Sequence, residues 1–370
     1  MLPLPRQNIL FDVSDPLLPR DRATVADLSQ FDEVIDVRTP SEYALDHIPR
    51  AFNLPVLSDA ERAQVGTLYK QLSPFDARKI GAALVAANIA RHLEQSLLDR
   101  SRAWRPLVYC WRGGQRSAAM THVLRQIGWD ARQLQGGYKA FRQYVLQQTP
   151  ALVARLHYRV VCGLTGSGKS RLLQALRRVG EQVLDLEGLA LHRGSLLGNL
   201  PDQPQPSQKM FESRLWDALG RLDPARAVYV ESESKKIGML QVPQSLLDAM
   251  WRSDCVELQA STPARVELLK SEYRHFLEDC EGLGSKLDFL APLHGYARIA
   301  HWKTMARGGV WDELVEELLV EHYDPAYRRS IGSHYSKLSE AHRVRVNAPT
   351  DDQFLSAARA VAHDKTVPVD

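Results

Sequence analysis

The stretch His157–Ser170, which reads HYRVVCGLTGSGKS, decides the fold of the second half of the chain. Its apolar run up to Cys162 predicts a buried strand, and the residues that follow match G-x-x-x-x-G-K-[ST]. Backbone N–H groups of such a loop surround a diphosphate, Lys169 neutralises its charge, and Ser170 reaches Mg²⁺. A helix is predicted over Ser170–Val179, where this mechanism requires one. The residues assigned to phosphate binding are Gly163, Gly166, Ser167, Gly168, Lys169 and Ser170.

The α/β pattern continues beyond this loop. Further strands are predicted over Gln182–Asp185, Ala227–Val230 and Cys255–Leu258. The proline-rich segment Pro201–Ser207 predicts a surface loop, and helical patterns dominate from Pro263 onward. We therefore expect a parallel sheet covered by helices, with a helical C-terminal part.

Several polar positions near this sheet are weaker candidates. Asp185 and Glu231 each end a predicted strand, so either is a candidate to face Mg²⁺; the alternative is a solvated strand end. No tightly bound metal is expected. The segment His192–Ser195 either contacts phosphate or substrate or is an ordinary loop. The segment Tyr323–Lys337 mixes aromatic and basic residues, which suits RNA, and a solvated helix face is the alternative.

The first half of the chain carries a second glycine loop, Cys110–Ser117, which reads CWRGGQRS. Cys110 ends a predicted strand, Pro106–Cys110, at the sheet edge where ligands bind in open α/β folds. Backbone N–H groups, the dipole of the following helix and the Arg116 guanidinium favour a Cys110 thiolate. A thiolate in such a cradle suits attack on sulfur, selenium or phosphorus; the alternative is a buried structural cysteine. The residues assigned to this anion loop are Trp111, Arg112, Gly113, Gly114, Gln115 and Arg116.

The elements around the cysteine loop also predict an α/β unit. The predicted strands are Glu33–Val37, Pro106–Cys110 and Ala131–Leu134. One helix is predicted to start within Thr39–Tyr43, and three more are predicted over Asp76–Leu98, Ser117–Ile127 and Tyr138–Gln147. The apolar face of the long helix is assigned to Ile80, Leu84, Val85, Ile89 and Leu93. Arg38 either adds to the anion field or pairs with Asp36 or Glu42. Thr149-Pro150 is interpreted as a break, which gives domains 1–148 and 149–370.

Composition excludes several classes of protein. The 370 residues include 47 basic and 44 acidic side chains, a formal charge of +3 that neither demands nor excludes a nucleic-acid partner. Apolar residues make up 44%, which excludes wholesale disorder. The four cysteines are far apart, so a zinc ribbon or a disulfide framework is not expected, and Cys162 is assigned to the core. The longest apolar stretch, Gly81–Ala90, is about half a membrane span. We expect a cytoplasmic protein without membrane contact.

Several motifs now support a resemblance. The segment Asp36–Tyr43, followed by His47-Ile48-Pro49, Ala51, Asn53 and Pro55, resembles the opening of a rhodanese domain. Cys110–Ser117 resembles the active-site loop of that domain, and Leu134–Arg142 (LQGGYKAFR) resembles its closing strand and helix.

A rhodanese-like domain followed by a P-loop domain resembles the bacterial tRNA 2-selenouridine synthase family. The motifs similar to that family's own are Tyr109–Gly114, Asp185–Gly188, His192–Ser195 and Glu231–Ser234. The resemblance implies an N-terminal rhodanese-like α/β domain and a C-terminal P-loop NTPase-like α/β domain with a helical C-terminal part.

The resemblance also implies an activity. Members of the family act on 2-thiouridine at the wobble position of tRNA, attach a geranyl group from geranyl diphosphate to the sulfur, and then replace the geranylthio group with selenium from selenophosphate. The position that matches the family's essential cysteine is Cys110, and Gly163–Ser170 matches its Walker A loop. Selenophosphate synthetase is a candidate partner.

Two hypotheses concern the ligands of the loops. Five residues separate Cys110 from Arg116, one more than in the usual sulfur-transferring rhodanese loop, and this spacing matches C-x₅-R-[ST] of cysteine phosphatases. We expect this wider loop to bind selenophosphate, with Cys110 taking selenium as a perselenide or relaying it onward. The P-loop recognises a diphosphate rather than adenine, so its ligand is either geranyl diphosphate or a nucleotide such as ATP or GTP.

Two other classes of protein remain as alternatives. One is a cysteine-dependent phosphatase fused to a kinase-like P-loop domain, which would turn over aryl phosphates. The other is a nucleotide-sensing binding module that docks a partner, for which Cys110→Ser would be harmless. The presence of Cys110, Arg116 and Lys169 together argues against the module.

Overall fold

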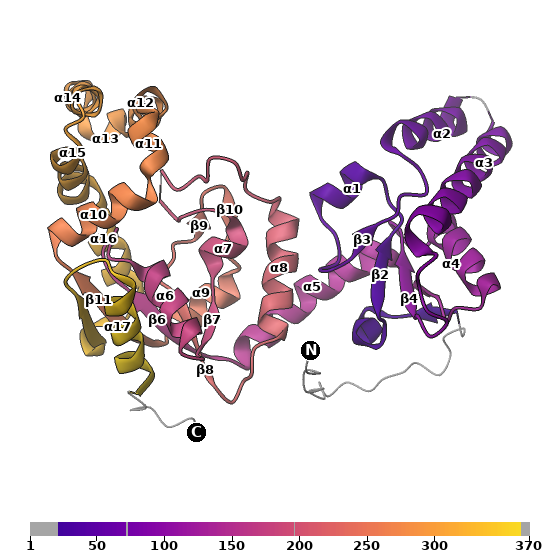
Figure 1. Ribbon diagram of the computed structural model, residues 1–370, viewed down its shortest axis with the longest axis horizontal. Coiled ribbons are helices and arrows are strands. Elements are labelled where there is room, and N and C mark those ends of the chain that lie inside the picture. The colour runs from indigo at the N-terminus through magenta and orange to yellow at the C-terminus, as the bar shows by residue number, and fades with distance from the viewer. Residues whose placement is uncertain (1–20, 72, 196, 364–370) are drawn as a thin grey trace. The chain divides into compact units, whose positions relative to one another are not determined.

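The computed structural model describes residues 21–71, 73–195 and 197–363, and the chain divides into two units between Gln147 and Gln148. Each unit contains one five-stranded sheet in which every pairing is parallel (Figure 1). Parallel strands require crossover connections, and helices supply most of them. Both units are therefore α/β, as the sequence predicts.

The first sheet has the strand order β1-β5-β4-β2-β3. Its strands are β1 (Arg22–Ala23), β2 (Glu33–Asp36), β3 (Phe52–Asn53), β4 (Pro106–Tyr109) and β5 (Arg132–Leu134). Its helices are α1 (Pro40–Leu45), α2 (Asp59–Gln71), α3 (Pro74–His92), α4 (Gln115–Ile127) and α5 (Gly137–Ala154), with a 3₁₀ turn, η1 (Val25–Gln30), and a π-helical segment, η2 (Leu93–Leu97). The central strand β4 is fully buried and ends immediately before Cys110.

The packed face of α3 agrees with the predicted one in part. Ile89 is buried, and Val85 and Leu93 pack against the same core, whereas Ile80 is 38% exposed. The helix also buries Ala77 and Gly81, and a Cβ at Gly81 would lie 3.3 Å from the Val65 side chain of α2. Close packing between α2 and α3 through these small residues turns Ile80 outward.

The helix predicted over Tyr138–Gln147 is longer than predicted. Helix α5 continues through Pro150 to Ala154. An interior proline removes one helical hydrogen bond and costs about 3 kcal/mol, so a helix usually ends before it. Here Thr149 and Val153 are buried, and the packing of this last turn offsets part of that cost.

The second sheet has the strand order β12-β11-β6-β8-β7. Its strands are β6 (His157–Cys162), β7 (Gln182–Leu184), β8 (Ala227–Glu231), β11 (Asp254–Ala260) and β12 (His342–Val346), and β9 (Lys236–Ile237) pairs with β10 (Leu240–Gln241) as a separate antiparallel ribbon. The helices between β6 and β11 in the chain are α6 (Lys169–Arg178), α7 (Leu186–Ala190), α8 (Gln208–Gly220) and α9 (Gln244–Trp251). The loop Pro201–Ser207 contains exposed and half-buried residues without a helix, as predicted.

Helices cover both faces of this sheet. On one face α6 packs beside α17 (Asp351–His363), and Leu172, Leu176 and Phe354 are buried against the strands. On the other face α8 and α9 bury Phe211 and Leu246 against Cys162 of β6. Cys162 is 1% exposed and belongs to this core, as predicted, and all four cysteines are free.

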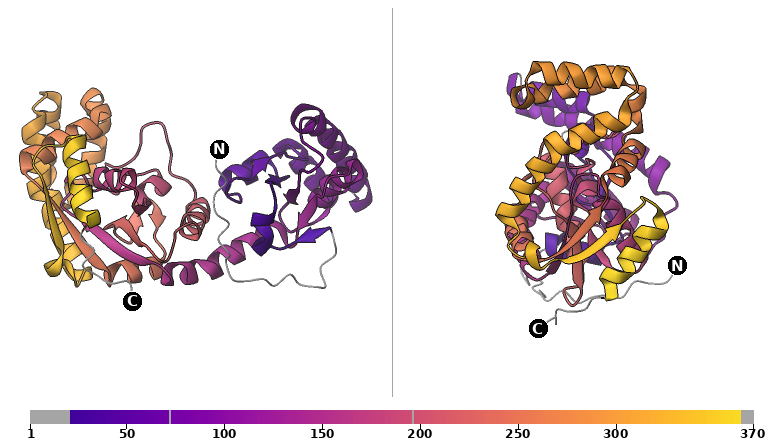
Figure 2. Two further views of the ribbon diagram at one scale, coloured as in Figure 1. Left: turned by 60° about the horizontal axis from the view of Figure 1, so that its bottom comes forward. Right: turned by 90° about the vertical axis from the view of Figure 1, so that its left-hand side faces the viewer.

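The C-terminal part is helical, with one exception. Its helices are α10 (Thr262–Glu272), α11 (Arg274–Glu278), α12 (Cys280–Leu287), α13 (Ala291–His294), α14 (Tyr296–Arg307), α15 (Trp311–Glu317), α16 (Asp324–His334) and α17, with short segments η3 (Asp288–Leu290), η4 (Leu318–Tyr323) and η5 (Leu338–Glu340). Helices α11 to α15 gather away from the sheet (Figure 2) around their own core, which includes the fully buried Trp302. The edge strand β12 was not among the predicted strands, although HRVRV alternates with a period of two. No helix in the described part of the chain is long and apolar enough to cross a membrane.

Candidate functional site

Cys110 lies at the carboxyl end of β4 with its sulfur held by two donors. The Gly114 N–H donates to Sγ at 3.2 Å, and the Ser117 hydroxyl donates to it at 3.1 Å. Gln133 of β5 fixes Ser117, because its Nε2 donates to the hydroxyl oxygen at 2.8 Å. Hydrogen bonds of this kind favour a charged acceptor. The geometry therefore suits a Cys110 thiolate.

The loop after Cys110 ends at the N-terminus of α4. Gly114 is the N-cap of this helix and has no side chain to cap it, so N–H groups of the first turn lack a helical partner. Trp111, Arg112 and Gln115 are exposed. The first turn can therefore receive an anion beside the sulfur.

Arg116 is oriented by an acid in the first turn of α1. Its guanidinium donates to Glu42 at 2.8 Å, and the Arg116 side chain is only 17% exposed. Burial acts to raise the pKa of the Glu42 carboxyl, but the hydrogen bond and charge of Arg116 outweigh it and the net pKa is lowered. Thr39 caps α1 together with Glu42, which holds the acid in place. The pair fixes the guanidinium at the edge of the cysteine loop.

Arg38 pairs with Asp36, which is the structural role among the two that the sequence suggests for it. It is 1% exposed and forms a two-pronged ion pair with the buried Asp36, at 2.6 Å for the shorter contact. Its guanidinium also lies 4.0 Å from the centre of the Tyr138 ring. These contacts join β2 to α5, and the Asp36 carboxylate balances the charge of Arg38.

The motif LQGGYKAFR closes over the cysteine loop. The Tyr138 N–H donates to the Cys110 carbonyl at 2.8 Å, and the Lys139 N–H donates to the Trp111 carbonyl at 3.0 Å. Gly137 allows this approach, because a Cβ there would lie 2.3 Å from the Cys110 carbonyl oxygen and 2.5 Å from the Gly113 nitrogen. The motif thus sets the backbone of the cysteine loop.

We expect Gly137→Ala to destabilise the first unit and to disturb the loop. Gly137 has φ +57°, and its new methyl group would meet backbone atoms that cannot move away. Gly128→Ala is the matched control, since Gly128 has φ +111° but open space around its Cβ position. Urea unfolding should show a loss about 2 kcal/mol larger for Gly137→Ala than for the control. Equal losses would show that strain in φ alone, and not the close approach, explains the glycine.

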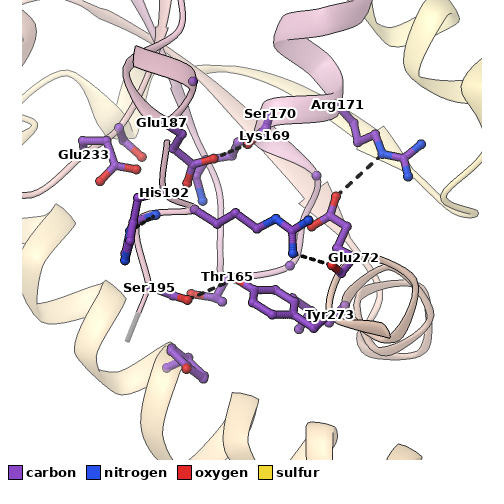
Figure 3. A pocket seen from close by; sticks show the side chains of 18 of the residues that line it. Thr165, Lys169, Ser170, Arg171, Glu187, His192, Ser195, Glu233, Glu272 and Tyr273 are labelled. Atoms are coloured by element: carbon purple, nitrogen blue, oxygen red, sulfur yellow. Dashed lines mark hydrogen bonds and ion pairs between the residues drawn. The ribbon is translucent and has the colours of Figure 1, made fainter. Parts of the chain in front are cut away.

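The second candidate site is a cavity of about 790 Å³ in the second unit (Figure 3). Its walls come from the loops after β6, β7 and β8, from the end of α10, and from η4 and α16. Gly166, Gly168, Lys169 and Ser170 of the assigned phosphate loop line it. Gly163 and Ser167 line a neighbouring cavity of about 610 Å³ instead.

Lys169 and Ser170 supply the cation and the hydroxyl group expected at a phosphate site. The Lys169 ammonium donates to the Gly163 carbonyl at 2.9 Å and lies 5.3 Å from the centre of the Tyr327 ring. The Ser170 hydroxyl donates to Glu187 at 2.7 Å. Gly168 has φ +89°, and a Cβ there would lie 2.4 Å from the Phe354 ring, so α17 packs directly on the loop.

One buried and two half-buried acids lie near Lys169 and Ser170. Glu231 is 1% exposed, and its Oε1 accepts the Glu187 N–H at 2.8 Å. Burial first, and then the charges of neighbouring acids, raise the pKa of Glu231 well above its usual range. Burial also raises the pKa of Glu187, and burial with the Glu187 charge raises the pKa of Glu233 to about 8. Asp185 also lines the cavity, but its carboxylate caps α7 by accepting the Gly188 N–H at 2.7 Å.

Glu187 and Glu233 were not singled out from the sequence. Both lie two residues beyond the strand-ending acids, within the motifs Asp185–Gly188 and Glu231–Ser234, and this is the signal that marks them. The Ser170 hydroxyl and the Glu187 carboxylate fit a Mg²⁺ ion that is held mainly by phosphate oxygens and water. The described residues contain no group of three or more metal-binding side chains that would hold an ion by themselves.

We expect the ligand-free protein to lose stability as the pH rises from about 5 to 8. The pKa of Glu233 is raised to about 8 in the fold from a usual value of 4.5, so its stabilising contribution is complete below 4.5 and is lost as the pH rises through 8. Glu233→Gln should flatten this dependence of the unfolding free energy, and the exposed Glu316→Gln should leave it unchanged. A profile for Glu233→Gln as steep as that of the wild type would contradict the assignment.

The segment His192–Ser195 forms another wall of the cavity, and its contact with phosphate or substrate stays a prediction. The Arg193 guanidinium lies 4.9 Å from the centre of the Tyr273 ring and donates to the Glu272 carbonyl. The Ser195 hydroxyl and the Tyr273 hydroxyl are 3.1 Å apart (Figure 3). The motif thus joins the cavity to the end of α10.

The aromatic side chains of Tyr323–Lys337 do not form an exposed stacking surface for RNA, whereas Arg328 and Arg329 are exposed, as on a solvated helix face. Tyr323 and Tyr327 line the cavity, Tyr335 is 4% exposed in the core, and the His334 ring lies 4.6 Å from Trp251. Lys337 is taken up by an ion pair with Asp254 at 2.8 Å. The aromatic side chains of this segment face inward because they pack against the second sheet and the P-loop.

Comparisons with known proteins agree with this architecture. Residues 21–144 match the family described as "Rhodanese-like domain", and residues 156–284 match "tRNA 2-selenouridine synthase AAA domain". The chain is 37% identical over 250 residues to a protein of Sulfurovum sp. named "tRNA 2-selenouridine synthase", a match that covers 65% of each chain. It is 36% identical to one of that name from Nitrosomonas europaea, covering 65% of this chain and 63% of the relative.

A third relative is matched over more of its length. The "tRNA 2-selenouridine synthase" of Shewanella denitrificans is 33% identical over 330 residues, which cover 80% of this chain and 87% of the relative. The match therefore includes both units and their order along the chain. The chain belongs to the tRNA 2-selenouridine synthase family.

Proposed function

We propose that this protein converts 2-thiouridine to 2-selenouridine at the wobble position of tRNA in the cytoplasm. In this proposal geranyl diphosphate and selenophosphate are co-substrates, and S-geranyl-2-thiouridine is the intermediate. The observation that carries it is the presence, in one chain of this family, of two separate glycine loops that each follow a buried parallel strand. One loop presents a cysteine with two donors on its sulfur, and the other presents Lys169 in a cavity of about 790 Å³.

The first step places geranyl diphosphate at the P-loop. The sulfur of 2-thiouridine attacks C1 of the geranyl group, the C–O bond breaks, diphosphate leaves, and the proton on N3 of the base is released. Charge develops on the leaving diphosphate, and the Lys169 ammonium stabilises it. Mg²⁺ near Ser170 and Glu187 would add positive charge to the same oxygens when bound. ATP or GTP is the competing ligand for this loop.

The second step places selenophosphate at the cysteine loop. S-geranyl-2-thiouridine, selenophosphate and water give 2-selenouridine, geranylthiol and phosphate. Selenium in selenophosphate is already at the oxidation level of selenide, so a perselenide on Cys110 would need a two-electron oxidant. Attack of the Cys110 thiolate on phosphorus needs none: the P–Se bond breaks, selenide leaves toward C2 of the base, and water later hydrolyses the phosphocysteine.

The cysteine loop suits that attack on phosphorus. The N–H groups at the start of α4 can receive the phosphoryl oxygens, and Arg116 adds a planar cation whose position is fixed by Glu42. Cys110 is the nucleophile in this assignment. Selenophosphate synthetase is the proposed partner, because its product, selenophosphate, is the co-substrate assigned to this loop.

We expect Arg116→Lys to slow the selenophosphate-dependent step by about 10²-fold, because a planar fork is replaced by a point charge. The geranylation step should continue at the rate of the wild type. Arg125→Lys, on the same helix and bonded to the Ala131 carbonyl, is the control and should change neither step. Kinetics of each half-reaction measure this, and unchanged selenophosphate use in Arg116→Lys would remove Arg116 from the site.

The proposal as a whole is tested by nucleoside mass spectrometry. The wild-type protein is incubated with tRNA that carries 2-thiouridine, with Mg²⁺, and with both, one or neither of the two co-substrates. Selenouridine with both, and S-geranyl-2-thiouridine with geranyl diphosphate alone, are expected. An unchanged uridine together with turnover of an aryl phosphate would favour the phosphatase instead.

A further inference from the structure

A second, apolar cavity of about 70 Å³ opens beside the P-loop cavity. It lies among α10, α11, α12, α15 and η4, the helices that gather away from the sheet (Figure 1). Its walls are mostly large hydrophobic side chains, among them Phe276, Leu283, Leu314, Leu318 and Leu319. Ordinary core packing leaves few voids larger than one water molecule, so an apolar space of this size is notable.

The two cavities are neighbours that share part of their walls. Thr165, Ser195, Leu269, Tyr273 and Tyr323 line both of them. Thr165 belongs to the phosphate loop itself, and Figure 3 shows it beside Ser195 and Tyr273. One molecule with a charged end at Lys169 and an apolar end can therefore occupy both spaces.

We propose that the apolar cavity holds the hydrocarbon tail of a short prenyl diphosphate while its diphosphate lies on the P-loop. This inference rests on the proposed function and names a site for the part of the co-substrate that the P-loop does not recognise. Burial of apolar carbon atoms there supplies affinity that inorganic diphosphate lacks. Binding of the tail there also fixes the position of the donor along its length, and so determines which of its carbon atoms faces the P-loop cavity.

The chemistry of the walls favours a hydrocarbon over a nucleotide base as the occupant. Ring nitrogens and amino groups of a purine need hydrogen-bond partners, and burying them without partners is costly. The walls are mostly apolar, and among their polar side chains Ser195 lies within hydrogen-bond distance of Tyr273 and Lys270 pairs with Asp312. A prenyl chain makes no such demand.

The size of the cavity favours a short chain. One water-sized group occupies roughly 10–15 Å³ on this scale, so the partly open space takes about five to seven such groups. In this proposal the first carbon atoms of the chain lie in the part shared with the P-loop cavity. We therefore expect a geranyl chain of ten carbon atoms to bind better than a farnesyl chain of fifteen.

Calorimetry on the full-length protein with Mg²⁺ tests the site. The ligands are inorganic diphosphate and the non-reacting thiolodiphosphate analogues of geranyl and farnesyl diphosphate. We expect the wild type to bind the geranyl analogue at least about 30-fold more tightly than inorganic diphosphate. Val315→Phe, which narrows the cavity, should weaken geranyl binding about tenfold or more and leave inorganic diphosphate binding unchanged.

Two further variants complete the test. Val320→Phe is the matched control, since Val320 is 56% exposed and lies outside the cavity walls, and it should bind like the wild type. Leu277→Ala, which widens the cavity, should improve binding of the farnesyl analogue relative to geranyl. Unchanged binding of inorganic diphosphate shows that each variant is folded. If Val315→Phe is not folded by that criterion, Leu277→Phe takes its place.

The outcomes separate this inference from the proposed function. Tight geranyl binding that requires Lys169 but ignores Val315→Phe and Leu277→Ala overturns the tail site and leaves the proposed function standing. Failure of the wild type to bind the geranyl analogue, while ATP binds, overturns the donor assignment and the tail site together. Loss of geranyl affinity confined to the cavity variants supports the tail site.

Discussion

Cys110→Ser is expected to abolish selenouridine formation, by about 10³-fold or more, while geranylated tRNA accumulates. A serine hydroxyl can accept the hydrogen bonds of Gly114 and Ser117, but it stays protonated near neutral pH and is a far weaker nucleophile than a thiolate. The P-loop lies in the other unit of the chain, so the geranylation step keeps its residues. Nucleoside mass spectrometry after incubation with both co-substrates measures the two products.

The matched control for this variant is Cys280→Ser. Cys280 is a half-buried free cysteine on α12, away from both phosphate loops in sequence and in contacts. It should form selenouridine like the wild type. Selenouridine formation by Cys110→Ser at more than a few per cent of the wild-type rate would exclude Cys110 as the nucleophile.

Lys169→Ala is expected to lower geranylation by about 10²–10³-fold, the usual loss when one charge-stabilising group is removed from a transition state. Lys169 is the cation of the phosphate loop that lines the cavity. Lys235→Ala, an exposed lysine beyond β8, is the control and should react normally. The rate of S-geranyl-2-thiouridine formation is the measurement.

A second readout makes the Lys169 prediction specific. The variant should still convert tRNA that already carries S-geranyl-2-thiouridine to selenouridine when selenophosphate is added. If Lys169→Ala fails at this step as well, the P-loop also serves selenium transfer, and the separation of the two steps is wrong.

Much of the fold follows from local sequence patterns. The strands that flank the two loops are short apolar runs that end in glycine or polar residues, and β4, β6, β8 and β11 lie where those runs predict them. The capped start of α1 follows from Thr39, Pro40 and Glu42 in the same way. These signals are local, so tertiary contacts are not needed to find them.

Other features depend on contacts between distant residues. Helix α5 passes through Pro150 in a turn whose Thr149 and Val153 are buried, and Ile80 is exposed because α2 packs on Gly81. The inward direction of Tyr323 and Tyr327 depends on a P-loop about 160 residues earlier in the chain. Local periodicity carries no information about such partners.

The same distinction applies to the sites. Cys110 and the phosphate loop are marked by glycine spacing, whereas Glu187 and Glu233 become noticeable only when three strand ends bring them together beside Lys169. The apolar cavity is built from side chains of several separate helices. Its shape is a property of their packing and leaves no motif in the chain.

The central claim is that the two loops perform two successive steps on one uridine, and a crossed reaction tests it most directly. Cys110→Ser protein is first given 2-thiouridine tRNA and geranyl diphosphate, and the tRNA is then purified and given to Lys169→Ala protein with selenophosphate. The account predicts selenouridine in the final tRNA, and none when the order of the two variants is reversed. Absence of selenouridine in the forward order, or equal amounts in both orders, would contradict it.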